Sequence, residues 1–204
     1  MDTVLKIKSG SKRYEGSVTY EEGDLIEAVF GDQPDLSVGD QLPCLMTTND
    51  EVISRFEAVV IAKAGKRLFL FHSPTAVEFR EQRRRYPRFD TDIQGWLEFP
   101  PEDRDRFGVA NRAVRVINLS LGGIAIRSET PLPVDAEPLL FVELYGRNQA
   151  DGLIRPRLQI IHERVDSSHY DYGCRIRTIR SQSFHNLRKY ILQRQLEERR
   201  LLLT

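Results

Sequence analysis

Gln82-Arg83-Arg84-Arg85-Tyr86-Pro87-Arg88-Phe89 is the most basic stretch of this 204-residue chain. Five arginines fall between Arg80 and Arg88, against one nearby acid, Glu81. Proline lacks a backbone N–H and favours extended geometry in the residue before it, so the pattern indicates a loop that leads into a strand. The arginine fork suits phosphate oxygens and the O6/N7 edge of guanine. Taken alone, the stretch fits an anion-binding site and a solvated basic linker equally well.

The segments on the N-terminal side of this stretch have the pattern of short antiparallel strands. β-Branched and aromatic residues are concentrated in six segments that are separated by glycine-containing or acidic turns: 4–8, 14–20, 25–30, 41–47, 52–64 and 67–72. We expect these segments to form a small β-domain over residues 1–77, with Val59, Ile61, Leu68 and Leu70 in its core.

The segments on the C-terminal side predict a second β-domain. Six further strands are expected at 93–99, 112–119, 124–127, 139–145, 153–163 and 170–179, with a polar loop at 100–106. Short turns and the absence of alternating helices favour a small closed or nearly closed β-barrel. Apolar residues at three-to-four spacing predict an amphipathic helix over 181–200, which either covers the barrel or faces a partner. The expected organisation is a mainly β protein of two small β-barrel domains, with a linker at 78–90 and the second barrel, six-stranded and antiparallel, with its helix at 91–204.

Charge and cysteine content describe the two halves further. The formal net charge is zero, but residues 1–75 carry −4 and the remainder carries +4. After residue 75 the only lysine is Lys189, and the other 21 basic residues are arginines, which favours bidentate recognition. Cys44 and Cys174 lie far apart in the sequence and have no metal-ligand spacing. With no signal peptide and no long apolar run in the sequence, we expect a cytoplasmic protein with no transmembrane segment.

A second motif, Asn118-x-Ser120-x-x-Gly123, follows the arginines by about 30 residues. An asparagine amide donates and accepts at once, as the edge of a guanine requires. Ser120 offers a small hydroxyl to a ribose or phosphate oxygen, and glycines at 122 and 123 permit positive φ and close approach of a flat ligand. Taken alone, this composition is that of a common turn.

Together, Arg84-x-x-x-Arg88 and Asn118-x-Ser120-x-x-Gly123 resemble the signature of the PilZ domain family, over about residues 78–200. The resemblance implies a six-stranded barrel with a C-terminal helix that binds the bacterial second messenger cyclic di-GMP. Carried over, Arg84 and Arg88 would contact guanine and phosphate, Asn118 and Ser120 would hold the guanine and ribose side, and Gly123 would keep the turn open. No separate cofactor or metal is implied.

Two further features refine the resemblance. Arg83 directly precedes the motif, and in the family an arginine there accompanies binding of an intercalated cyclic di-GMP dimer. An N-terminal β-domain ahead of the barrel is similar in architecture to the flagellar-brake branch. That likeness implies regulation of a protein partner such as a flagellar motor component and recruitment to the flagellar basal body. A polysaccharide synthase or a transcription factor would fit the sequence as well.

Other readings of the sequence lead to different functions. An enzyme is not expected, because the chain lacks nucleotide-binding glycine loops, a His-Glu-x-x-His zinc motif and a nucleophile elbow around Ser120. A single-stranded nucleic-acid-binding barrel is a stronger rival, but the basic residues concentrate in one cluster instead of a track with interleaved aromatics. A PilZ-type adaptor that acts chiefly through protein contacts is a third reading.

Overall fold

The computed structural model describes residues 3–48, 51–72, 86–145 and 150–201. The chain divides into two compact units, Met1–Tyr86 and Pro87–Thr204. The expected linker at 78–90 falls largely outside the described residues, so its boundaries stay a prediction.

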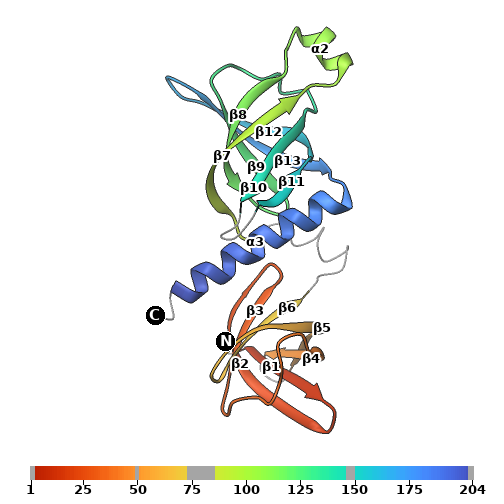
Figure 1. Ribbon diagram of the computed structural model, residues 1–204, viewed down its shortest axis with the longest axis vertical. Coiled ribbons are helices and arrows are strands. Elements are labelled where there is room, and N and C mark those ends of the chain that lie inside the picture. Colours follow the sequence, from red (N-terminus) through yellow and green to blue (C-terminus); the bar gives the residue numbers. More distant parts are fainter. Residues whose placement is uncertain (1–2, 49–50, 73–85, 146–149, 202–204) are drawn as a thin grey trace. The chain divides into compact units, whose positions relative to one another are not determined.

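The first unit is a closed antiparallel barrel in which the strands follow one another as β1-β2-β3-β6-β5-β4 (Figure 1). Buried and exposed side chains alternate along β2 and much of β4, because successive residues of a strand point to opposite faces, whereas β3 is buried on both faces. Tight turns connect β1 to β2 and β5 to β6. The six strands are β1 (Thr3–Ser9), β2 (Lys12–Glu22), β3 (Leu25–Phe30), β4 (Gln41–Thr48), β5 (Glu51–Ala64) and β6 (Arg67–His72).

The prediction of Leu68 and Leu70 as core residues is confirmed, because both are fully buried, but the prediction for β5 is not. Ala58 and Val60 are buried there, whereas Val59 and Ile61 are only partly buried. Both faces of this strand are apolar, so alternation alone could not select the inner one.

One charged group of the same barrel is fully buried on the face of β3 opposite to the core residues Ile26 and Ala28. The Glu27 carboxylate has no exposed surface and accepts hydrogen bonds from Arg67 Nη1 at 2.6 Å and Thr19 Oγ1 at 3.0 Å. A buried charge is tolerated only when it is paired in this way.

The second unit is an antiparallel sheet whose ends meet. Its strand order is β11-β10-β12-β13-β9-β8-β7, and an additional pairing of β10 with β7 joins six of the strands into a ring (Figure 1). The barrel and C-terminal helix expected for this half are confirmed. The strands are β7 (Phe89–Glu98), β8 (Arg112–Leu119), β9 (Gly123–Ser128), β10 (Leu139–Tyr145), β11 (Ala150–Ile154), β12 (Arg157–Val165) and β13 (Tyr170–Thr178).

Two details of the second unit differ from the sequence-based expectation. The single strand expected at 153–163 is divided into β11 and β12 at Arg155-Pro156, where proline cannot donate a ladder hydrogen bond. The polar loop expected at 100–106 contains a helix, α2 (Pro101–Phe107), with Pro101 at its first position and Gly108 in the left-handed conformation at its C-cap.

The C-terminal helix α3 (Ser181–Leu201) packs against β11 and β10. Leu187 and Ile191 are buried on its apolar side. Ser183 accepts a hydrogen bond from the Arg155 N–H at 3.2 Å, and the Asn186 amide donates to the Leu153 carbonyl at 3.3 Å. The helix therefore satisfies backbone groups at the edge of the sheet that would otherwise be open.

Candidate functional site

Pairing of β7 with β8 brings the end of the arginine motif beside the second motif. Arg88 is exposed and directly precedes Phe89, which is buried and lies opposite Leu119. The next residue, Asp90, lies opposite Asn118. Two motifs separated by about 30 residues therefore meet at one end of this strand pair. Of the predicted site residues, the structure brings Arg88, Asn118, Ser120 and Gly123 into one region, while Arg83 and Arg84 lie outside the described residues.

Asn118 is held by a residue that the sequence did not single out. Its side-chain Nδ2 donates a hydrogen bond to Asp90 Oδ1 at 3.0 Å. This bond fixes the amide orientation while the amide oxygen is directed elsewhere, so Asp90 is a positioning residue for Asn118. Only the strand register reveals Asp90, which in the sequence is one of several aspartates after the arginines.

Ser120 closes the turn between β8 and β9. Its side chain is 6% exposed; its Oγ donates to the Gly123 carbonyl at 3.0 Å and accepts from the Gly123 N–H at 3.1 Å. A backbone bond from Ser120 N to the same carbonyl, at 2.9 Å, completes the turn. The hydroxyl therefore shapes the loop after Asn118, and its direct contact with a ligand stays a prediction.

Gly123 is required for a reason other than the one expected. Neither Gly122 nor Gly123 has positive φ. A Cβ atom at Gly123 would lie 2.7 Å from the backbone oxygen of Cys174 on β13, whereas one at Gly122 would meet nothing within 4 Å. Glycine at this position therefore permits β13 to approach the start of β9 closely, next to the turn.

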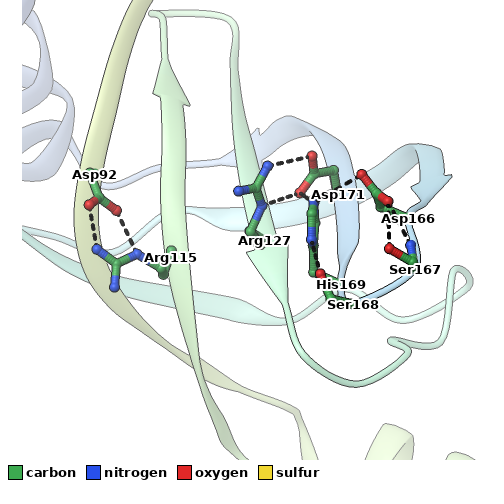
Figure 2. Close-up of polar contacts among 8 residues, drawn as sticks. All are labelled: Asp92, Arg115, Arg127, Asp166, Ser167, Ser168, His169 and Asp171. Carbon is green, nitrogen blue, oxygen red and sulfur yellow. Dashed lines mark hydrogen bonds and ion pairs between the residues drawn. The ribbon is translucent and has the colours of Figure 1, made fainter.

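Ion pairs on the outer face brace the strands that carry the motifs (Figure 2). Arg115 on β8 binds both carboxylate oxygens of Asp92 on β7, with Nε to Oδ1 at 2.5 Å. Arg127 on β9 binds Asp171 on β13 through two parallel bonds of 2.7 and 2.9 Å. The second pair holds the pKa of the Asp171 carboxyl below its usual range, because the Arg127 hydrogen bond favours the charged form.

Helix α3 adds a cation near the arginine motif. The guanidinium carbon of Arg194 lies 5.9 Å from the centroid of the Phe89 ring, a distance typical of a cation–π contact. Phe89 directly follows Arg88, so α3 contacts the point where the motif enters the barrel. In the sequence, Arg194 is one of several arginines late in a helix, and nothing there connects it with residue 89.

Other chemistry is weakly represented in the described part of the chain. Burial raises the pKa of both thiols, Cys44 and Cys174, to about 12, which leaves them protonated and unreactive at neutral pH. Among residues that the structure describes, no group of three or more histidine, cysteine, aspartate or glutamate side chains could hold a metal ion. The described helices include none with the length and apolar character needed to span a membrane.

Comparison with known proteins places these observations in a family. Similar solved structures include the inhibitor of motility MotI/DgrA of Bacillus subtilis (17% identity, 97% of each chain, TM-score 0.47). YcgR of Escherichia coli in complex with c-di-GMP is 13% identical, with 99% of this chain and 88% of that chain covered and a TM-score of 0.44. The K. pneumonia MrkH–c-di-GMP complex is 17% identical, with 97% and 89% covered and a TM-score of 0.41.

These structural likenesses are too distant to carry an argument about function, and no curated protein sequence matches the chain significantly. The family assignment rests on the sequence pattern of the PilZ domain, which matches residues 82–193, more than half of the chain. That range contains both motifs, the ring of strands and most of α3. The chain belongs to the PilZ domain family.

Proposed function

We propose that this chain is a cyclic di-GMP receptor that changes its interdomain arrangement on binding and regulates a protein partner in motility, as a flagellar brake does. The ligand would be held by Arg83, Arg84 and Arg88 on one side and by Asn118, Ser120 and Gly123 on the other. The family assignment supports this proposal.

The observation that carries the proposal is the β7–β8 register. It sets Asp90 opposite Asn118, so the exposed Arg88 lies two residues before the residue that pairs with the asparagine. An arginine fork and an oriented amide at one place supply donors for phosphate and guanine and an acceptor for the guanine edge. A basic linker without a binding role would not need an oriented amide on β8, the strand that pairs with β7 directly after the last arginine.

The position of the arginines in the sequence suggests how binding could be transmitted. Arg83 and Arg84 lie at the end of the first unit's residue range, and Arg88 lies at the start of the second. A ligand with two phosphates and two guanines that engages all three would restrict the chain between the units. A ligand can shift an arrangement only by binding one state better than another, and simultaneous contact with all three arginines in one arrangement would supply such a difference.

The direct test removes Arg84 and Arg88 together and measures affinity by calorimetric titration with cyclic di-GMP. A good bidentate arginine contact contributes about 1–3 kcal/mol. We therefore expect Arg84→Ala with Arg88→Ala to weaken binding by about 2–6 kcal/mol, from roughly 30-fold to roughly 10⁴-fold. The matched control removes two exposed arginines from α2, Arg104→Ala with Arg106→Ala, which loses the same charge and should leave affinity within about twofold.

Small-angle scattering with and without nucleotide tests the interdomain step. The intact protein should change its radius of gyration or distance distribution on saturation, and the Arg84→Ala, Arg88→Ala protein should not. Unchanged affinity in the double variant would refute the site. Tight binding with identical scattering curves would refute the interdomain change while leaving the receptor assignment in place.

A further inference from the structure

A surface pocket of about 840 Å³ lies on the first barrel, away from both PilZ motifs in the sequence. Four neighbouring strands contribute to it, in the order β2, β1, β4 and β5. Its volume is within the usual range for sites that bind a small molecule or a short stretch of peptide. The motifs of the proposed nucleotide site contribute no residue to this pocket.

The strand registers identify which side of the barrel wall the pocket faces. Lys6 lies opposite Glu15 on β2 and opposite Leu45 on β4, and Leu45 lies opposite Arg55 on β5. Residues in one cross-strand row share a face of the sheet. Lys8 belongs to the same face by alternation, and it is exposed. The charged lining residues therefore project outward from the barrel.

The pocket has the opposite charge to the domain that carries it. Residues 1–75 contain eight basic and twelve acidic residues. Half of the basic residues line the pocket, namely Lys6, Lys8, Arg13 and Arg55, but only two of the acidic ones do. A local excess of positive charge on a negatively charged domain attracts anionic groups to one place.

The basic residues outside the pocket are already engaged. Lys12 pairs with Asp35 at 2.7 Å and Arg67 pairs with the buried Glu27 at 2.6 Å. The ammonium groups of Lys63 and Lys66 donate to backbone carbonyls.

The basic residues of the pocket are largely unpaired. Lys6 reaches Glu15 only at 3.8 Å. Among the residues that the structure describes, Lys8, Arg13 and Arg55 have no hydrogen-bond acceptor or acid within contact distance. These three side chains therefore retain their donors for an external anion.

An apolar side chain lies among the charges. Leu45 is half-buried and shares the outward row of Lys6 and Arg55. The rings of Tyr14 and Phe56 belong to the opposite row and pack against the core of the barrel, so Leu45 is the apolar contact on the outward face. The ligand should therefore combine anionic and apolar groups.

We propose that this pocket is a docking site for an acidic segment of a protein partner, with carboxylates at Arg13, Arg55 and Lys8 and an apolar side chain on Leu45. The barrel is closed, so the segment binds through side chains and not by adding a strand. Glu15 and Glu57 also line the pocket, and they would repel a continuous phosphate backbone, which argues against a nucleic acid. The inference goes beyond nucleotide binding and does not require it.

Fluorescence anisotropy of a labelled octapeptide of alternating glutamate and leucine, added to the full chain, tests the site. We expect saturable binding that Arg13→Glu with Arg55→Glu weakens about tenfold or more, since both attractions become repulsions. The control, Lys12→Glu with Lys66→Glu, makes the same change in net charge at exposed positions of the same barrel outside the pocket. It should retain binding within about twofold.

Two further probes distinguish the outcomes. A lysine–leucine octapeptide should not bind, and a ten-residue oligothymidine should not displace the acidic peptide. No binding of the acidic peptide, equal loss in both double variants, or displacement by oligothymidine would each overturn the proposal. Each titration is run with and without cyclic di-GMP. Failure of the nucleotide to bind therefore counts only against the proposed receptor function, and failure of the peptide only against this pocket.

Discussion

Gly123→Ala tests whether close approach of β13 shapes the turn that follows Asn118. The added Cβ would lie 2.7 Å from the backbone oxygen of Cys174, whereas ordinary contact begins at 3.4 Å. The two strands would have to separate by about 0.7 Å at this point. The obstructing atom belongs to the backbone and is fixed by the pairing of β13 with β9, so it cannot rotate away. Overpacking of this kind costs about 1–3 kcal/mol.

Urea denaturation followed by tryptophan fluorescence measures that cost in the second unit, which contains Gly123. Trp96 is the only tryptophan of the chain and lies on β7, so its emission reports unfolding of the second unit alone. The midpoint for Gly123→Ala should fall by the amount that corresponds to about 1–3 kcal/mol, with an unchanged slope.

The neighbouring glycine provides the matched control. At Gly122 an added Cβ meets nothing within 4 Å, and φ is not positive. Gly122→Ala should therefore stay within about 0.5 kcal/mol of the parent protein. Equal midpoints for the two variants would show that the close approach to Cys174 does not constrain the turn.

Two further predictions concern the same unit. Tyr172→Phe should lower the free energy of unfolding by about 1–3 kcal/mol, measured by Trp96 fluorescence, because the phenol accepts the buried Leu132 N–H at 2.9 Å and donates to Glu163; an unchanged value would contradict this role. Since Arg127 lowers the pKa of Asp171, the Arg127–Asp171 pair should contribute a small amount of stability above about pH 5 and lose it as the pH falls through the depressed pKa. The difference between the parent protein and Asp171→Asn should shrink on acidification; a difference that grew would reverse the assigned sign.

Much of the fold could be predicted because the strands are short and strongly patterned. The six strands of the first barrel and the C-terminal helix follow from alternation, turn residues and three-to-four spacing. The inner face of β5 did not follow, since both of its faces are apolar. The α2 helix was missed although Pro101 at its start, early acids and Gly108 at its end are ordinary helix signals; charge and proline content made the segment look like a loop.

The candidate site was predictable only where local motifs define it. Asn118, Ser120 and Gly123 lie within six consecutive positions and could be recognised together. The contribution of Asp90 depends on the register of β7 against β8, and that of Arg194 on how α3 lies against the barrel. Both are tertiary relationships, and a single sequence does not encode them in any short pattern. The requirement for glycine at position 123 likewise comes from contact with a strand about 50 residues later in the sequence.

Calorimetric titration of the full chain with cyclic di-GMP tests the central claim most directly, because it reports affinity and stoichiometry together. The account predicts saturable binding that is lost or greatly weakened in the Arg84→Ala, Arg88→Ala protein and is preserved in the α2 control. Arg83 ahead of the motif predicts two nucleotides per chain, and a ratio of one would refute that role of Arg83 alone. The absence of any binding heat at saturating nucleotide would contradict the receptor function itself.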